Sequence, residues 1–219
     1  MSYEVAEIFY SLQGEGLHAG RSAVFCRLAR CNLWSGEEAD RPSSPCWFCD
    51  TDFLRKDGQL GGTYPGASQL ADVIYRCWHT AVCTLDAAQQ PYVVFTGGEP
   101  LLQLDDHLLK HVKAYGFCSA VETNGTIPAP SLVDWITVSP KANTPLIQQS
   151  GNELKLPFPQ EDIDPACYLG MNFEYFFLLP IYLPDPQQTA ENTRLALAYC
   201  LANPPWRLTG QAHKLWNIA

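Results

Sequence analysis

The sequence predicts an α/β fold built on a mostly parallel sheet, and three observations lead to this prediction. Short apolar strand segments alternate with segments of helical periodicity, as in right-handed βαβ units. Polar residues follow nearly every strand segment, on the side of the sheet where a site is expected. The chain has 219 residues and spends about forty on one irregular stretch, whereas a complete eight-unit barrel takes about 250. We therefore expect an incomplete (β/α) barrel of about six parallel strands.

Strand segments recur from the N-terminus onward. Residues 3–9 alternate apolar and polar side chains and lead into a glycine-rich turn at Gln13 to Gly16, and residues 23–28 form a second apolar segment. Residues 92–95 form a continuous apolar run, which is typical of a parallel strand covered on both faces. The remaining strand segments are residues 117–121, 135–138, 153–156 and 175–179.

Three helices are expected between or after these strands. Ser68 is a candidate cap for the first helix, in which apolar side chains recur at i, i+3, i+4, i+7 and i+8. This apolar stripe consists of Leu70, Val73, Ile74, Cys77 and Trp78. The second helix is expected through residues 104–112 and the third over about 189–202. Prolines interrupt the helical pattern between the later strands, so the helical signal there is weak.

Composition excludes several classes of protein. Hydrophobic residues make up 47% of the chain, which excludes a disordered protein, and no linker divides it, so we expect one domain over residues 1–219. The net charge of −9 argues against nucleic-acid binding. No apolar run approaches the roughly 20 residues of a membrane span, and the first residues do not resemble a signal peptide. We expect a cytoplasmic protein.

Three of the nine cysteines lie in an irregular stretch, residues 30–66. Cys31, Cys46 and Cys49 have the spacing C-x14-C-x2-C, and two thiolates two residues apart can chelate one metal or cluster. On spacing alone, an iron–sulfur cluster and a zinc ion with His18 or a distant cysteine as fourth ligand fit equally well. The other cysteines match no such pattern and are expected in the core. They are Cys26, Cys77, Cys83, Cys118, Cys167 and Cys200.

A second candidate binding segment is Thr96-Gly97-Gly98-Glu99-Pro100, directly after a predicted buried strand. Two glycines allow a ligand to approach the backbone, and the Glu99 carboxylate can face a cationic group. The alternative is an ordinary strand-to-helix turn.

Together, the cysteines and the Gly-Gly-Glu segment resemble the radical S-adenosylmethionine superfamily. That resemblance implies a [4Fe–4S] cluster on Cys31, Cys46 and Cys49, with Phe48 at the family's aromatic position. It also implies that S-adenosylmethionine occupies the open iron and that the Gly97-Gly98-Glu99 motif receives its amino group. A zinc module has no use for this second motif.

Further segments are similar to the 7-carboxy-7-deazaguanine synthase family within that superfamily, of which a subset has the same expanded first cysteine gap. The matching segments run through most of the chain. They are Ser11 to Gly16, Arg27, Arg30 to Leu33, Cys49 to Asp52, Phe95 to Leu101, Glu122 to Gly125, Ser139 to Lys141, and His213 to Leu215.

The family resemblance implies a lyase of queuosine and 7-deazapurine biosynthesis. Its substrate, 6-carboxy-5,6,7,8-tetrahydropterin, is converted to 7-carboxy-7-deazaguanine with loss of ammonia, through a radical made from S-adenosylmethionine. The resemblance further implies Mg²⁺, an electron donor such as flavodoxin, and a homodimer. Any link to tRNA runs through a small precursor.

The same resemblance implies roles for individual residues, with none catalytic beyond the cluster and cofactor. Thr51 is implied as the Mg²⁺ ligand, and residues 210–219 as a tail that closes the substrate site. The implied substrate contacts are Leu12, Gln13, Gly14, Arg27, Thr96 and the terminal carboxylate of Ala219. The implied S-adenosylmethionine contacts are Phe48, Cys49, Asp50, Gly98, Glu99, Ser139, Pro140, Lys141, Leu179, Pro180, Ile181 and Tyr182.

Some alternatives remain at the level of the sequence. Residues 179–182 read Leu-Pro-Ile-Tyr where the family has Gln-Pro-Met-Asp, so a polar amide and a carboxylate are missing there. Arg27 also fits a structural ion pair, and Glu15 and Glu122 fit either auxiliary polar contacts or structural carboxylates. For the whole protein, the alternatives are another enzyme of the superfamily, such as a glycyl-radical activating enzyme, and a zinc-binding module without turnover.

Overall fold

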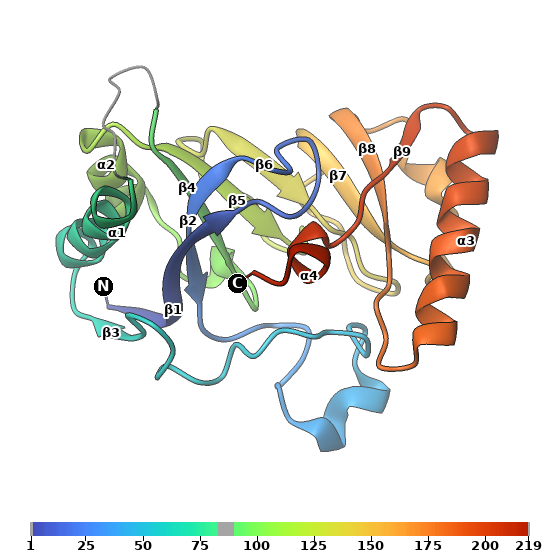
Figure 1. Cartoon of the computed structure of the whole chain (residues 1–219), viewed down its shortest axis with the longest axis horizontal. Helices are drawn as coiled ribbons and strands as arrows, with labels where there is room; N and C mark the ends of the chain where they lie inside the picture. The colour runs from blue at the N-terminus through green and yellow to red at the C-terminus, as the bar shows by residue number, and fades with distance from the viewer. Residues whose placement is uncertain (1, 83–89, 219) are drawn as a thin grey trace.

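The computed structural model describes residues 2–82 and 90–218, and its strands form one curved sheet (Figure 1). The strand order in the described residues is β3-β1-β2-β4-β5-β6-β7-β8-β9. The strands are β1 (Tyr3–Leu12), β2 (Ser22–Leu28), β3 (Gly62–Tyr64), β4 (Tyr92–Gly97), β5 (Cys118–Thr123), β6 (Trp135–Val138), β7 (Ser150–Phe158), β8 (Asn172–Pro180) and β9 (Trp206–Leu208). The α-helices are α1 (Ala67–Ala81), α2 (Asp106–Ala114), α3 (Pro186–Ala202) and α4 (Ala212–Trp216). Single 3₁₀ turns cover Glu38–Ser43, Pro100–Leu102 and Pro165–Tyr168.

Most of the sheet is parallel, and it does not close. Strands β2 and β4 to β9 are parallel to one another, whereas β1 is antiparallel to both of its neighbours, β2 and β3. In the described part of the chain, β3 and β9 are the two edges, so the predicted incomplete barrel is confirmed. The parallel set contains one strand more than the six expected, because the three-residue β9 is too short to produce a pattern in the sequence.

The helices cover the two ends of the sheet (Figure 1). Helices α1 and α2 pack beside the β1–β5 end with their apolar faces in one core cluster, and α3 packs beside β8 and β9 over a second. Asp105 and Asp185 cap α2 and α3 by accepting from backbone N–H groups. The prediction that Ser68 caps α1 is wrong: Gly66 is the cap residue, with extended backbone, and Ser68 lies inside the helix.

Several short elements had no counterpart in the sequence prediction. They are β3, β9, α4 and the 3₁₀ turns, each six residues or fewer, which is too short to display a periodicity. The connections 124–134 and 139–149 contain no helix in the structure, consistent with their prolines. Cys83 lies outside the described residues. Of the helices that the structure describes, none has the length and apolarity to cross a lipid bilayer.

Candidate active site

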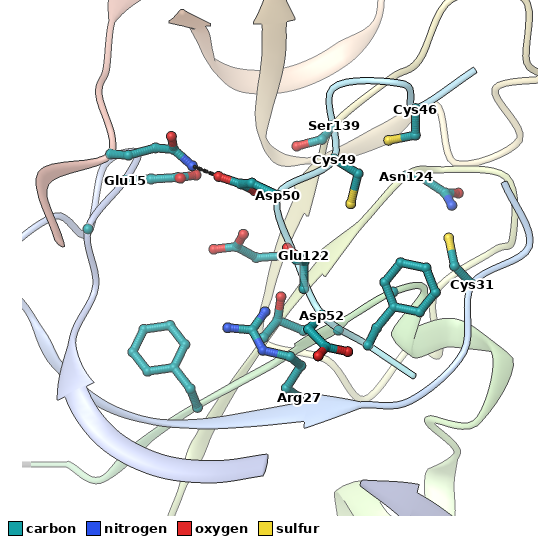
Figure 2. Close-up of a pocket in the computed structure, with 18 of the residues that line it drawn as sticks. Glu15, Arg27, Cys31, Cys46, Cys49, Asp50, Asp52, Glu122, Asn124 and Ser139 are labelled. Carbon is teal, nitrogen blue, oxygen red and sulfur yellow. Dashed lines mark hydrogen bonds between the residues drawn. The ribbon is translucent and has the colours of Figure 1, made fainter. Parts of the chain in front are cut away.

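A cavity of about 670 Å³ lies between the sheet, the irregular stretch 30–66 and α4 (Figure 2). Its wall includes residues from β1, β2, β4, β5, β7 and β8, and from the loops that follow several of these strands. Parallel strands bring their carboxyl ends to one edge of a sheet, and this explains why segments so distant in sequence converge here.

Most of the residues implied by the family resemblance line this one cavity. Glu99 and Pro140 are not among the lining residues, and Ala219 lies outside the described part of the chain. The lining residues from that set are Leu12, Gln13, Gly14, Arg27, Cys31, Cys46, Phe48, Cys49, Asp50, Thr51, Thr96, Gly98, Ser139, Lys141, Leu179, Pro180, Ile181 and Tyr182.

Cys31, Cys46 and Cys49 point into one region of the cavity (Figure 2). The Cys46 thiol donates to Cys49, so the pKa of Cys49 is lowered and that of Cys46 is raised. Three converging thiols are the ligand type that an iron–sulfur cluster requires. Among the described residues, no group of three or more His, Cys, Asp or Glu side chains is placed to hold a metal ion.

His18, the candidate fourth ligand of a zinc site, lies elsewhere. Its Nδ1 is 2.9 Å from the Tyr92 hydroxyl oxygen, and its ring lies against Trp135 with centroids 4.2 Å apart. Neither partner belongs to the cysteine group, so the zinc interpretation loses this ligand.

The Gly-Gly-Glu segment packs against the residue before Cys31. A Cβ atom on Gly98 would lie 2.1 Å from the Arg30 carbonyl oxygen and 2.8 Å from Cys31 Cβ, so only glycine fits here without displacement. The Glu99 N–H also donates to the Arg30 carbonyl at 2.9 Å. This junction holds β4's carboxyl end beside the first cysteine.

The carboxylate of Glu99 lies differently from the expectation that it faces a ligand. It is fully buried and accepts from the Thr123 hydroxyl at 2.8 Å, the Asn124 N–H at 2.8 Å and the Leu101 N–H at 2.9 Å. Burial raises the pKa of Glu99, and these hydrogen bonds act in the opposite direction. In this structure Glu99 therefore ties the ends of β4 and β5 together, and the backbone of Gly97 and Gly98 borders the cavity.

Arg27 both lines the cavity and forms an ion pair. Its Nε lies 2.8 Å from Glu7 Oε1 on the antiparallel neighbour β1, and in the parallel pairing of β2 with β4 it stands beside Thr96. The guanidinium is labelled in Figure 2 together with Glu122 and Asp52. Arg27 therefore forms a structural ion pair and lines the cavity at the same time.

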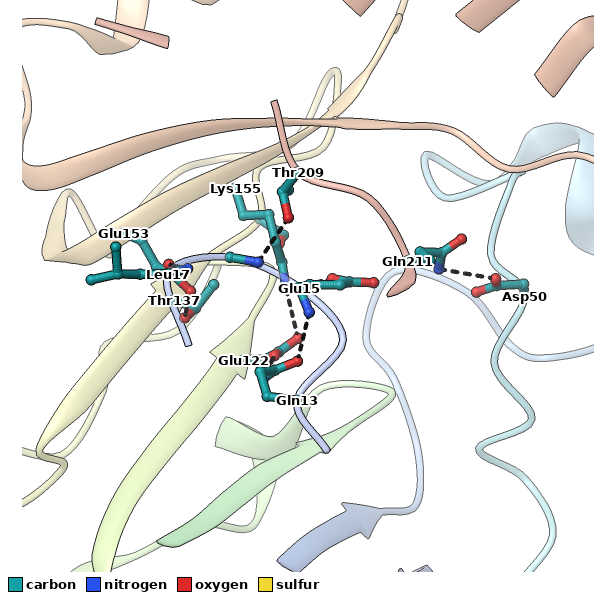
Figure 3. Close-up of polar contacts among 12 residues, drawn as sticks. Gln13, Glu15, Leu17, Asp50, Glu122, Thr137, Glu153, Lys155, Thr209 and Gln211 are labelled. Carbon is teal, nitrogen blue, oxygen red and sulfur yellow. Dashed lines mark hydrogen bonds and ion pairs between the residues drawn. The ribbon is translucent and has the colours of Figure 1, made fainter. Parts of the chain in front are cut away.

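The loop of residues 13–21, here called the floor loop, enters the cavity from an unexpected side. Because β1 is antiparallel, its end pairs with the beginning of β2, so this loop leaves from the amino edge of the parallel strands. Gln13, Gly14 and Glu15 do line the cavity, as expected of the polar residues after the first strand, but they reach it from the amino edge because β1 is antiparallel. The loop folds inward, where Gln13 Nε2 donates to Glu122 Oε1 at 2.9 Å and the Leu17 N–H donates to Glu153 Oε2 at 2.9 Å (Figure 3).

The C-terminal helix α4 covers another part of the wall. Gln211, His213 and Lys214 line the cavity, and the Ala212 N–H donates to the Gly14 carbonyl at 3.0 Å. A Cβ on Gly14 would lie 2.4 Å from His213 Nδ1, so the absence of a side chain lets α4 dock on the floor loop.

Comparisons with known proteins agree with this architecture. No protein-family model matches the chain. A 7-carboxy-7-deazaguanine synthase from Bordetella pertussis is 53% identical over 220 residues, covering all of both chains. One from Bradyrhizobium diazoefficiens is 53% identical over 218 residues, with the same coverage.

The chain belongs to the 7-carboxy-7-deazaguanine synthase family. The crystal structure of QueE from Escherichia coli superimposes with a TM-score of 0.68 at 26% identity, over 97% of this chain and 95% of that one. The family resemblance, the function that its name states and the α/β fold inferred from the sequence are confirmed, and the chain is an enzyme, a synthase.

Other side chains of this synthase's cavity were not singled out from the sequence. They include Glu7, Arg55, Asp57 and Lys155. The sequence does mark Lys155 as unusual, because it is a charged residue between two leucines in a predicted strand. Asp52, Asn124, His213 and Lys214 lie in segments that match the family, and Gln211 lies in the implied tail, but no individual role was implied for any of them.

Proposed function

We propose that the chain converts 6-carboxy-5,6,7,8-tetrahydropterin to 7-carboxy-7-deazaguanine with release of ammonia, as a radical S-adenosylmethionine lyase of queuosine and 7-deazapurine biosynthesis. The observation that carries the proposal is that three cysteines share one cavity of about 670 Å³ with Arg27, Thr96 and Gln13. A cluster site and a polar site for a small carboxylated heterocycle thus adjoin.

The cysteine group fits a [4Fe–4S] cluster held by Cys31, Cys46 and Cys49, with S-adenosylmethionine beside it. When bound, the cluster and S-adenosylmethionine together supply the one-electron chemistry that generates a carbon radical. The bare backbone of Gly97 and Gly98 leaves room for the methionine end of the cofactor. Glu99 contributes indirectly in this proposal, because its buried carboxylate fixes the backbone of this segment.

We assign the nucleoside end of S-adenosylmethionine to the part of the cavity wall formed by residues 48–50 and 179–182 together with Ser139 and Lys141. The backbone of Phe48, Cys49 and Asp50 lies on one side of this region, and Ser139, with Lys141, lies on another. Residues Leu179–Tyr182 supply backbone groups and apolar surface there, in place of the polar side chains of other family members.

The substrate's two ends are assigned to different residues. Arg27 is suited to a carboxylate because its guanidinium offers several parallel N–H donors. Thr51 would offer its hydroxyl to Mg²⁺, a hard ion that takes oxygen ligands and would assist in binding the substrate carboxylate. Leu12, Gln13 and Gly14 of β1 and the floor loop face the pterin edge, and Thr96 adds a hydroxyl.

The tail of residues 210–219 completes the enclosure. Its helix α4 lies over Gly14 and excludes water from the cavity, and its terminal Ala219 is assigned to the substrate's amino edge. The assignments of cytoplasmic location, a homodimer, a flavodoxin-like electron donor and one domain over residues 1–219 rest on the sequence and the family resemblance.

The test is anaerobic reconstitution with iron and sulfide, electron paramagnetic resonance after reduction, and a turnover assay with S-adenosylmethionine, Mg²⁺ and 6-carboxy-5,6,7,8-tetrahydropterin. We expect a cluster signal that changes when S-adenosylmethionine is added, and ammonia formed together with the deazapurine. A protein that binds zinc but forms no cluster contradicts the cofactor assignment. A cluster that cleaves S-adenosylmethionine without contracting the pterin ring contradicts the substrate assignment.

A further inference from the structure

Lys155 is a charged residue inside the protein. It lies in the middle of β7, its side chain is 2% exposed, and no other Lys or Arg in the described residues is classed as buried. Its Nζ lies 2.6 Å from Glu15 Oε2 and 3.0 Å from Glu122 Oε2 (Figure 3). An isolated ammonium at such a site is strongly disfavoured, so the two carboxylates are what allow it to be there.

The two partners of Lys155 come from different parts of the cavity. Glu15 belongs to the floor loop, whereas Glu122 belongs to β5. The other oxygen of Glu122 accepts from Gln13 Nε2, also in the floor loop, at 2.9 Å. Lys155 therefore joins the floor loop to β5 and β7 through one closed network of Gln13, Glu15 and Glu122.

All four members of this network line the cavity. The floor loop leaves from the amino edge of the sheet, so its position in the cavity depends on contacts made after it turns inward. Further contacts hold it, among them the Gly16 N–H that donates to Thr209, the Leu17 N–H that donates to Glu153, and the Ala212 N–H that donates to the Gly14 carbonyl. The contact of Glu15 with Lys155 differs from these because it is an ion pair between two charged side chains.

The charges that face this network come from four elements. Glu15 lies on the floor loop, Glu122 on β5 and Glu153 on β7, and the positive charge of Arg27 on β2 also acts on Glu122. Burial raises the pKa of the Tyr92 hydroxyl on β4, and the negative charges of Glu122 and Glu153 add to this. Burial alone would raise the pKa of Glu122, but Lys155, Gln13 and Arg27 hold it below its usual value.

We propose that Lys155 is a positioning residue of the pterin site: it holds Gln13 and Glu15 of the floor loop toward the cavity and balances the two carboxylates that face them. This proposal rests on the proposed function, because it assumes that Leu12 to Gly14 contact the pterin. Lys155 acts through these residues and is assigned no contact with substrate.

Removing the ammonium has a defined consequence. In Lys155→Met, two carboxylates face each other in a buried site without their cation, so the pKa of one of them rises. At higher pH both are ionised, they repel, and the floor loop moves away from β5. At lower pH one carboxyl takes up a proton and donates a hydrogen bond to the other, which restores the approach. Binding of a pterin by the variant therefore weakens as the pH rises.

The probe is 6-carboxypterin, an oxidised and fluorescent relative of the substrate, whose quenching reports binding to the reconstituted protein. We expect Lys155→Met to bind it at least about ten-fold more weakly than wild type at about pH 7.5, with most of the loss recovered at about pH 6. Cluster content should equal that of wild type. Hydrogen exchange of residues 13–21 should rise in the variant at the higher pH without any ligand.

A second variant separates positioning from folding. In Lys155→Met with Glu122→Gln, one charge of each sign is removed, so the network returns to a single carboxylate and the pH dependence should disappear. The matched control is Lys113→Met, which removes the lysine that pairs with Asp134 on the outside of the molecule and should bind like wild type.

The outcomes are distinct. If wild type fails to bind 6-carboxypterin at any pH, the proposed function fails. If wild type binds and Lys155→Met binds equally well, or loses the same affinity at every pH, the positioning role is overturned and the proposed function stands. Unfolding of both variants also overturns it, because Lys155 is then required for folding alone.

Discussion

Asp50 in the irregular stretch 30–66 pairs with Lys214 in α4, 164 residues further along the chain. Gln211 Nε2 also donates to Asp50 at 3.3 Å, and the Lys214 ammonium lies 3.7 Å from the centroid of the Tyr182 ring. The residue that follows the third cysteine thus holds the C-terminal helix, which itself rests on Gly14 of the floor loop. The irregular stretch, α4 and the floor loop are thus linked to one another along the wall of the cavity.

We predict that Asp50→Asn loosens α4 without unfolding the protein. The pair is partly exposed, so its loss should change the free energy of unfolding by at most about 1 kcal/mol. The hydrogen exchange of the amides of Ala212 and Ile218, measured by mass spectrometry of the C-terminal peptide, should become faster. The matched control is Glu191→Gln, which removes an exposed ion pair on α3 and should leave this exchange unchanged.

The same pair predicts a pH dependence with a definite sign. Burial acts to raise the pKa of Asp50, but the Lys214 ammonium holds it below its usual value. A carboxyl whose pKa is lower in the folded state stabilises that state above its unfolded pKa of about 3.9, and this stabilisation is lost as the pH falls through the folded value. The difference in tail exchange between wild type and Asp50→Asn should therefore be constant from about pH 7 to about pH 5 and shrink below about pH 4. A difference that grows on acidification contradicts this pairing.

We predict that Cys31→Ala abolishes both the cluster and the cleavage of S-adenosylmethionine. Two remaining thiols cannot hold a cubane that needs three, so iron content after reconstitution and the electron paramagnetic resonance signal should both fall to background. The control is Cys167→Ala, since Cys167 is exposed and does not line the cavity. A Cys31→Ala protein that still cleaves S-adenosylmethionine contradicts the ligand assignment.

The arrangement of the parallel strands could be predicted because it has a local cause. The apolar run 92–95 and the strand segment 135–138 appear in the structure as β4 and β6, because short apolar segments between turn residues are typical of strands in a parallel sheet. The convergence of the cysteines with Arg27 and Thr96 then follows from parallel pairing, in which Arg27 stands beside Thr96.

Other features could not be predicted, because they depend on pairing between distant segments. The direction of β1 depends on its antiparallel pairing with β2, which no local pattern in the sequence predicts. The inward turn of the floor loop likewise has no local sequence pattern. The Glu99 carboxylate is satisfied by Thr123 and Asn124, more than twenty residues away, so the motif alone suggested a ligand where the structure has an internal hydrogen-bond network. The partners of Lys155, Glu15 and Glu122, are also distant from it in the sequence.

We predict that Arg27→Ala weakens pterin binding and leaves the cluster intact. Loss of hydrogen bonds to a carboxylate should reduce affinity about ten- to hundred-fold, and Arg27→Lys should recover part of it because the charge remains. Binding is measured with 6-carboxypterin, and cluster content by iron analysis. The control is Arg76→Ala on α1, whose guanidinium donates to the Asp72 carbonyl away from the cavity. Loss of iron in Arg27→Ala would instead point to its ion pair with Glu7 as a folding contact.

We predict that Gly98→Ala damages the cluster site. The added methyl group would meet the Arg30 carbonyl oxygen at 2.1 Å and Cys31 Cβ at 2.8 Å, so the backbone before the first cysteine must move. Overpacking of this kind costs about 1–3 kcal/mol, and here the displaced segment carries a cluster ligand. The matched control is Gly170→Ala, because a Cβ there has no heavy atom within 4 Å. Iron content, thermal stability and S-adenosylmethionine cleavage should all fall in Gly98→Ala and stay near wild type in Gly170→Ala. If Gly98→Ala loses stability but keeps its full cluster, the contact between β4 and Cys31 supports the fold and not the cluster.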